Sequence, residues 1–255
     1  MSPVPAEALR PFLLGWSLLA AAVFVALLFV DAPYGRHRRA GWGPAIPARA
    51  GWILMELPAV VLVPALFALS ERRSDPAAAA FVLLWSLHYV HRGLLAPARL
   101  GAGASPMPLS VAALGFVFNL ANGLLQGAWL FSAGPKLGAE WLLAPPFLLG
   151  IALFLAGMAV NRRADEALRG LRAPGETGYR VPRGGLFELV SCPNYLGEVV
   201  EWSGWALLTW SPSGLVFALW TAANLVPRAL AHHRWYRRTF PDYPPGRKAI
   251  FPFVL

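Results

Sequence analysis

The sequence predicts an all-α protein that crosses a membrane several times. Of its 255 residues, 57% are hydrophobic and only 14% are charged, whereas roughly a quarter of the residues in a soluble domain are charged. Several apolar runs approach the ~20 residues with which a helix crosses the hydrocarbon core of a bilayer. A transmembrane barrel would instead show short segments of alternating polarity. We therefore expect one polytopic helical domain over residues 1–255.

Seven apolar spans can be placed along the chain, so the two termini are expected on opposite sides of the membrane. The first span is long for a signal peptide, and no small-residue cleavage site follows it before Asp31. The sixth is the weakest, because Glu198 and Glu201 interrupt its beginning. The expected spans are about 11–30, 51–69, 77–95, 109–131, 146–161, 196–211 and 213–232.

Positive charge predicts the orientation of these spans. Sixteen of the 22 lysines and arginines fall in one set of loops and only four in the opposite set. Cytoplasmic loops carry the excess of lysine and arginine, which places the N-terminus outside and the C-terminus in the cytoplasm. The same rule accounts for the net charge of +9, so no nucleic-acid partner is expected. The basic set comprises residues 31–50, 96–108, 162–195 and the tail after the seventh span.

Neither a disulfide nor a metal site is expected. The chain has one cysteine, Cys192, which excludes an internal disulfide and a multi-thiolate site. His88 and His91 lie three residues apart, but no third ligand is spaced with them.

Two polar side chains lie at the same depth in neighbouring spans. Glu56 is five residues into the second span and Tyr89 is six residues before the end of the third. At ~1.5 Å per residue, both lie about 8–9 Å below the same surface. A carboxylate at that depth is costly and is a functional candidate. Tyr89 alone is typical of interfacial packing, but the shared depth makes the pair a candidate catalytic site.

The fourth span carries amides. Asn122 and Gln126 are four residues apart and share a helical face, beside the small-residue pair Gly123 and Gly127. Two interpretations stay open: the amides make hydrogen bonds between helices, or they line a pocket for the polar end of a substrate.

The cytoplasmic ends of the last three spans carry polar stripes at helical spacing. One such stripe is typical of a solvated helix end, but three that converge indicate a polar pocket. Arginines suit phosphates, and carboxylates and amides suit ribose hydroxyls or a carboxamide. No Rossmann or P-loop motif is present. We expect the interval 162–195, a cytoplasmic loop with six arginines, to form much of a cofactor site. The stripes are Asn161, Asp165, Arg169 and Arg172; Asn194 and Glu198; and Arg228, His232 and Tyr236.

From about residue 50 onward, the chain resembles the steroid 5α-reductase family. The first fifty residues match only in a span followed by Tyr34-Gly-Arg-His37. The strings that carry the resemblance are Glu56-Leu-Pro, His88-Tyr-Val-His-Arg92, Asn122-Gly-Leu-Leu-Gln-Gly127, Leu171-Arg-Ala-Pro-Gly-Glu176, Gly178-Tyr-Arg-Val-Pro-Arg-Gly-Gly-Leu-Phe187, Ser191-Cys-Pro-Asn-Tyr-Leu-Gly-Glu198, Glu201-Trp202, His233-Arg-Trp-Tyr236, Asp242-Tyr-Pro and Pro252-Phe.

This resemblance implies a seven-helix membrane reductase that uses NADPH to reduce a 3-oxo-Δ4 steroid, with hydride going to C5 and a proton to C4. It implies that Glu56 and Tyr89 engage the 3-keto oxygen. Glu56 would either donate a hydrogen bond in its protonated form or, ionised, orient Tyr89 as the donor. The resemblance places these residues around the cofactor: Asn161, Asp165, Arg172, Tyr179, Arg180, Asn194, Glu198, Arg228, His232 and Tyr236.

Composition and motifs leave several alternatives. The richness in Ala, Leu, Arg and Pro favours a bacterial homologue in an inner membrane, with its cofactor site facing the cytoplasm. A reductase of another enone lipid fits the same motifs. A methyltransferase of the isoprenylcysteine carboxyl type, using S-adenosylmethionine, shares the Pro-Asn-Tyr…Glu pattern. A small transporter or lipid-binding protein is the non-enzymatic alternative, although repeated halves typical of transporters are not seen. Membrane lipid and a steroid-like substrate are the expected partners, with no obligate protein partner.

Overall fold

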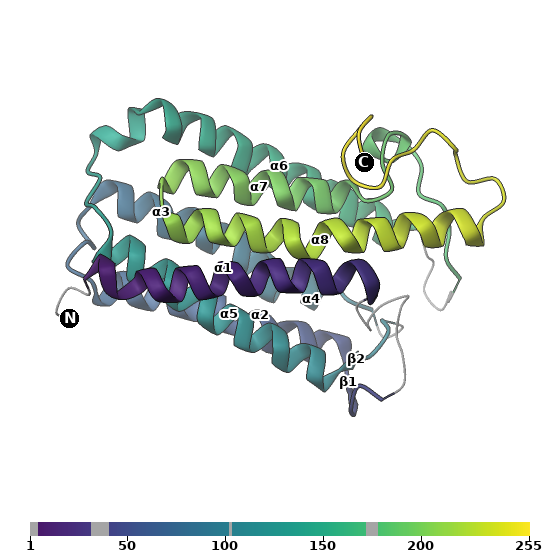
Figure 1. Ribbon diagram of the computed structural model, residues 1–255, viewed down its shortest axis with the longest axis horizontal. Helices are drawn as coiled ribbons and strands as arrows, with labels where there is room; N and C mark the ends of the chain where they lie inside the picture. The colour runs from purple at the N-terminus through teal and green to yellow at the C-terminus, as the bar shows by residue number, and fades with distance from the viewer. Residues whose placement is uncertain (1–4, 32–40, 102–103, 172–177) are drawn as a thin grey trace.

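The computed structural model describes residues 5–31, 41–101, 104–171 and 178–255, and these residues form an elongated bundle of helices (Figure 1). The described part contains seven long helices: α1 (Ala6–Phe29), α2 (Ala48–Leu69), α3 (Pro76–Val90), α5 (Leu109–Ala128), α6 (Pro145–Gly170), α7 (Pro193–Thr209) and α8 (Pro212–Thr239). The shorter elements are β1 (Ala45–Ile46), η2 (His91–Leu95), α4 (Ala96–Ala98), β2 (Met107–Pro108), η3 (Trp129–Ala133), η4 (Glu140–Leu143) and η5 (Gly185–Glu188). Strands β1 and β2 pair antiparallel.

Each expected span coincides with one long helix. Five of them, α1, α2, α5 with η3, α6 and α8, are long and apolar enough to cross a membrane. The other two, α3 with 15 residues and α7 with 17, are shorter. The protein is therefore a helical membrane protein with several spans.

Two helices extend beyond the apolar spans predicted for them, as the helical spacing of the polar stripes indicated. Helix α6 continues past 161 to Gly170, and α8 continues past 232 to Thr239. Apolar runs mark where a chain meets hydrocarbon, but polar residues extend a helix beyond it. The interval 162–195 is consequently not a continuous loop, because it is helical up to Gly170 and again from Pro193.

Local signals explain where α3 and α8 begin. Asp75 and Ser211 each precede a proline at the first helical position, and each side chain accepts a hydrogen bond from a backbone N–H in the first turn. Both features stabilise a helix N-terminus. Before Ser211, Trp210 has a left-handed backbone (φ 45°) that ends α7, so α7 and α8 form a tight hairpin.

Helices α6 and α7 touch backbone to backbone through four glycines. Gly150 and Gly157 on α6 face Gly204 and Gly197 on α7. A Cβ added at any of the four would lie 2.3–2.5 Å from a backbone nitrogen of the other helix. Only glycine permits such an approach. This contact fixes the ends of α6 and α7 that carry Asn161 and Asn194 against each other.

Aromatic side chains fill the space between α3, α7 and α8. Trp85, Trp202 and Trp205 are fully buried, and the ring centroid of Trp85 lies 5.6 Å from that of Trp202 and 5.4 Å from that of Trp205. The indole N–H of Trp85 donates to the carbonyl of Ala59 on α2 at 2.8 Å. This core positions the next turn of α3, which carries Tyr89.

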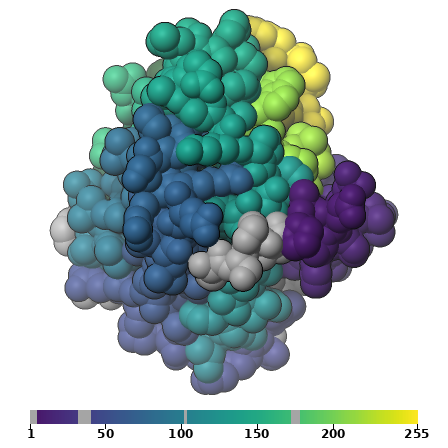
Figure 2. Space-filling model, turned by 90° about the vertical axis from the view of Figure 1, so that its left-hand side faces the viewer, coloured from purple at the N-terminus to yellow at the C-terminus, as the bar shows by residue number. Residues whose placement is uncertain are grey.

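Helix α1 lies at the edge of the bundle. Its buried residues Leu13 and Ala20 pack with Val216 and Trp220 of α8. Viewed along the bundle from the end opposite the C-terminal segment, α1 forms a ridge on one side (Figure 2). Its remaining face is apolar and exposed, with Phe12 67% exposed, as expected for a surface that meets lipid.

Candidate active site

Glu56 and Tyr89 both point into the bundle, where they are 4% and 3% exposed. The carboxyl group of Glu56 accepts from two donors: Arg92 Nε to Oε1 at 3.1 Å and Asn119 Nδ2 to Oε2 at 3.1 Å. The ring of Tyr89 lies against Trp85, with centroids 4.5 Å apart. Tyr89 lies one helical turn before Arg92, the residue that holds Glu56. The structure therefore brings the predicted acid and phenol to one interior region.

Arg92, which was not among the predicted site residues, links this region to the predicted cofactor residues. Its Nη1 donates to Glu198 Oε2 at 3.4 Å while its Nε holds Glu56. Its guanidinium lies over the ring of Trp52, 5.5 Å from the centroid, and its side chain is 27% exposed. The available signal was an arginine inside an apolar span, one helical turn after Tyr89.

Four of the predicted cofactor residues form a polar ladder between α6 and α7. Asn194 Nδ2 donates to Asp165 Oδ1 at 3.0 Å. Asn161 Nδ2 donates to the Asn194 carbonyl at 3.0 Å and lies 3.5 Å from Glu198 Oε2. The two predicted stripes therefore meet as neighbours across the glycine contact.

His88 and Glu201 form a buried pair that spacing along the sequence did not predict. His88 Nδ1 lies 2.7 Å from Glu201 Oε1, and the residues are 5% and 0% exposed. Within the described part of the chain, His88 Nε2 and Glu201 Oε2 are buried without a hydrogen-bond partner. The His88 ring meets the edges of Tyr89 and Trp202, with centroids 4.9 and 4.6 Å apart. The pair thus packs against the ring of Tyr89 through the His88 ring.

The amides of α5 favour the packing interpretation. Gln126 is fully buried, donates to the Ser213 carbonyl at 2.7 Å and accepts from Trp205 Nε1 at 3.0 Å. These hydrogen bonds join α5 to α7 and α8. Asn122, 1% exposed, lies 3.5 Å from Gln126 Nε2, and its own Nδ2 has no partner among the described residues.

The other predicted cofactor residues lie around α8, except Arg172, which is outside the described residues. His232 Nε2 lies 3.1 Å from the Tyr195 hydroxyl, and Arg228 lies over the Tyr195 ring at 5.6 Å. The Tyr179 ring meets Trp235 at 5.1 Å, and Tyr236 stacks on Tyr243 at 5.3 Å. Arg180 is exposed beside Tyr179.

The C-terminal segment folds back over the loop that carries Tyr179 and Arg180 (Figure 1). Arg247, 2% exposed, donates to the Pro182 carbonyl at 2.9 Å and to Glu188 Oε2 at 3.2 Å. The backbone N–H of Gly184, together with Arg247, holds the pKa of Glu188 below its usual range. The Ser191 hydroxyl lies 2.6 Å from both His233 Nδ1 and the Tyr243 hydroxyl. These contacts of the C-terminal segment hold the loop that carries Tyr179 and Arg180 against α8.

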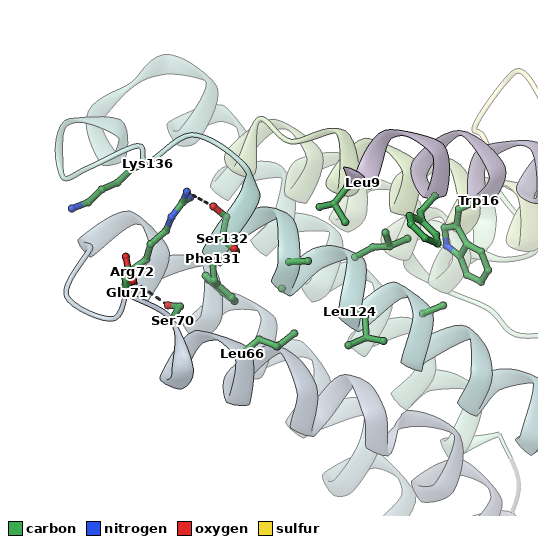
Figure 3. A pocket seen from close by; sticks show the side chains of 15 residues that line it. Leu9, Trp16, Leu66, Ser70, Glu71, Arg72, Leu124, Phe131, Ser132 and Lys136 are labelled. Carbon is green, nitrogen blue, oxygen red and sulfur yellow. Dashed lines mark hydrogen bonds between the residues drawn. The ribbon is translucent and has the colours of Figure 1, made fainter. Parts of the chain in front are cut away.

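An apolar crevice of about 790 Å³ opens at the other end of the bundle, between α1, α2 and α5 (Figure 3). Its polar rim includes Glu71, Arg72 and Lys136. Arg72 donates to the carbonyls of Leu130, Ser132 and Pro135 at 2.9–3.0 Å and closely approaches that of Gly134. The crevice is lined by neither Glu56 nor Tyr89.

No group of His, Cys, Asp and Glu that could hold a metal ion occurs in the part of the chain that the structure describes. An apolar helical bundle that buries acids and amides beside a tyrosine, connected by a partly buried arginine, has the features of a membrane-embedded enzyme.

Comparison with known proteins identifies the family. The family model described as 3-oxo-5-alpha-steroid 4-dehydrogenase matches residues 105–255. "Steroid 5-alpha-reductase DET2" of Gossypium hirsutum is 45% identical over 241 residues, which is 93% of each chain. "3-oxo-5-alpha-steroid 4-dehydrogenase 1" is 43% identical over 242 residues in Bos taurus and 41% identical over 239 residues in Homo sapiens, covering at least 92% of each chain. The chain belongs to the steroid 5α-reductase family. These relatives are from a plant and mammals, so a bacterial origin stays a prediction.

Proposed function

We propose that this protein reduces the Δ4 double bond of 3-oxo-Δ4 steroids with NADPH, delivering hydride to C5 and a proton to C4 and giving 5α-reduced 3-oxosteroids. Its relatives named as steroid 5-alpha-reductases or 3-oxo-5-alpha-steroid 4-dehydrogenases are 40–45% identical and cover most of the chain. The observation that carries the proposal is the buried Glu56, held by Arg92 and Asn119, with the buried Tyr89 one helical turn before Arg92.

The residues between α6 and α7 have the chemistry that NADPH requires. Asn161, which is buried, and the partly buried Asp165, Asn194 and Glu198 supply amide and carboxylate groups, which suit ribose hydroxyls and a carboxamide. Arg180 and Arg183 are exposed on the neighbouring loop and suit phosphates. When bound there, NADPH would supply the hydride.

In the proposed mechanism, Tyr89 donates a hydrogen bond to the 3-keto oxygen and Glu56 orients it. Reduction of an enone builds negative charge on the carbonyl oxygen, and a fixed donor at that oxygen lowers the barrier. Both Glu56 oxygens already accept, from Arg92 and from Asn119, so an acceptor role suits this carboxyl group. This favours the second of the two roles that the sequence left open for Glu56.

The aromatic core would exclude water from the reacting atoms. Trp85, Trp202 and Trp205 are fully buried behind Tyr89, and exclusion of water strengthens a hydrogen bond to developing charge. A flat apolar substrate would come from the bilayer, which the exposed apolar faces of α1 and α5 would contact.

We propose seven spans, with the N-terminus outside, the cofactor site in the cytoplasm and, for a bacterial protein, the inner membrane as its location. The helical run from α3 through η2 and α4 is continuous from Pro76 to Ala98, which is long enough to cross hydrocarbon. The ends of α6, α7 and α8 that carry the cofactor candidates lie together with the C-terminal segment (Figure 1), on the side rich in positive charge.

The test is to incubate purified protein with NADPH and a panel of 3-oxo-4-ene steroids and to analyse the products by mass spectrometry. A saturated product two mass units heavier, absent without NADPH, is expected. Thermal stabilisation by S-adenosylmethionine but not by NADPH would favour the methyltransferase. Reduction of other enone lipids but of no steroid would change the substrate class while keeping the reaction.

A further inference from the structure

One guanidinium connects the two halves of the proposed site. Arg92 Nε donates to Glu56 Oε1 at 3.1 Å, and its Nη1 donates to Glu198 Oε2 at 3.4 Å. We infer that Arg92 is a positioning residue that couples occupation of the cofactor site at Glu198 to the affinity of the substrate site at Glu56. This inference rests on the proposed function and adds to it a way in which cofactor binding changes the affinity for the substrate.

Each carboxylate has a second donor that anchors it independently of Arg92. Asn119 holds Glu56 Oε2 at 3.1 Å, and Asn161 lies 3.5 Å from Glu198 Oε2. Arg92 is therefore the shared element, with the shorter hydrogen bond on the substrate side and the longer one on the cofactor side. The longer bond is the weaker of the two, so a competing donor at Glu198 would displace Arg92 from that side first.

The local backbone holds Arg92 at this position. It belongs to η2 (His91–Leu95), one of two π-helical turns among the described residues, and such irregularities are frequent at functional sites. A Cβ on the next residue, Gly93, would lie 2.9 Å from Val60 Cγ2 and 3.1 Å from Glu56 Cβ, so this turn presses directly against α2. The ring of Trp52 supports the guanidinium from α2 at 5.5 Å.

These contacts allow two arrangements of the hydrogen bonds that Arg92 makes. While the cofactor site is empty, Arg92 divides its hydrogen bonds between Glu56 and Glu198. When a donor group of the cofactor engages Glu198, Arg92 is freed to bind Glu56 more closely, which fixes the acid beside Tyr89. The substrate would then bind better in the presence of the cofactor, and linkage requires the reverse to hold equally.

The experiment measures binding rather than turnover. Steroid dissociation constants are determined by tryptophan fluorescence, with and without saturating NADP⁺, for the wild type, Arg92→Lys and Arg99→Lys. Lysine keeps the charge of Arg92 but cannot reach both carboxylates as a planar fork. Arg99 is the matched control, because it lies at the same end of the bundle with its side chain 57% exposed.

In the wild type and Arg99→Lys, NADP⁺ should tighten steroid binding about 5-fold or more. In Arg92→Lys this ratio should fall close to one. A ratio in Arg92→Lys equal to that of the wild type would overturn the inference.

A second variant covers the case in which Arg92→Lys does not fold. Glu198→Gln removes the charge that draws Arg92 away from Glu56, so the steroid should bind without cofactor about as tightly as it binds the wild type with NADP⁺. Unchanged or weaker cofactor-free binding by Glu198→Gln would contradict the inference. Failure of the wild type to reduce any 3-oxo-4-ene steroid would instead reject the proposed function, so the two failures are distinguishable.

Discussion

Replacing Gly157 by alanine should damage both stability and cofactor binding, because this glycine lies in the closest contact between α6 and α7. Its Cβ would lie 2.3 Å from the backbone nitrogen of Glu201 and 2.5 Å from the carbonyl oxygen of Gly197. Real Cβ contacts are essentially never under 3.0 Å, so the helices must separate by roughly 0.7 Å or more. Neither neighbouring atom can rotate away, because both belong to the backbone.

The separation of α6 from α7 would lengthen the hydrogen bonds between these helices that lie one helical turn from Gly157. Asn161 Nδ2 lies 3.0 Å from the Asn194 carbonyl and 3.5 Å from Glu198 Oε2, and a displacement of this size breaks the longer contact. Overpacking costs about 1–3 kcal/mol, and a lost hydrogen bond adds about 1 kcal/mol. We expect a loss of about 2–4 kcal/mol, or at least roughly 4–8 °C in Tm.

The assay compares Gly157→Ala with Gly170→Ala on the same helix, where an added Cβ would meet nothing within 4 Å. Thermal unfolding in detergent and the dissociation constant for NADPH are measured for both variants. Gly170→Ala should be as stable as the wild type or slightly more stable. Equal Tm and equal NADPH affinity for the two variants would refute the described contact between α6 and α7.

Three further predictions concern separate regions. Tyr89→Phe and Glu56→Gln should each lower turnover by ~10²-fold or more while leaving the NADPH dissociation constant nearly unchanged; normal turnover in both would remove the pair from the chemistry. Arg172→Ala should mainly raise the NADPH dissociation constant, and unchanged affinity would contradict a phosphate role. Because the pKa of Glu188 is lowered in the folded state, its contribution to stability is present above its unfolded pKa and is lost as the pH falls through the lower folded pKa. Tm measured from pH 7 to pH 3 should therefore fall less steeply in Glu188→Gln than in the wild type, and parallel curves would argue against this effect.

Hydrophobic runs were sufficient to locate the helices but not their ends. A run such as 146–161 reports contact with hydrocarbon, whereas Arg162–Gly170 stays helical by intrahelical hydrogen bonding and by contact with α7. The four glycines of this contact were not recognised, because their seven-residue spacing on each helix becomes meaningful only when the two helices are placed together.

In the candidate site, too, the sequence predicted what depends on spacing within one helix, but not what depends on contacts between helices. Depth and spacing predicted that Glu56 and Tyr89 are interior residues and that Asn161, Asp165, Asn194 and Glu198 share one region. Arg92 and Glu201 were not selected, because their importance depends on partners 36 and 113 residues away in sequence, Glu56 and His88. Spacing within one helix also did not decide the role of Gln126, whose partners lie on other helices.

The most direct test of the central claim follows a labelled hydride. NADPH carrying deuterium at the transferable position of the nicotinamide is incubated with the protein and a 3-oxo-4-ene steroid, and the product is analysed by NMR. The expected product is a saturated 3-oxosteroid with deuterium at C5 and a solvent-derived hydrogen at C4. Deuterium at C4, or a solvent-derived hydrogen at C5, would contradict the proposed reaction.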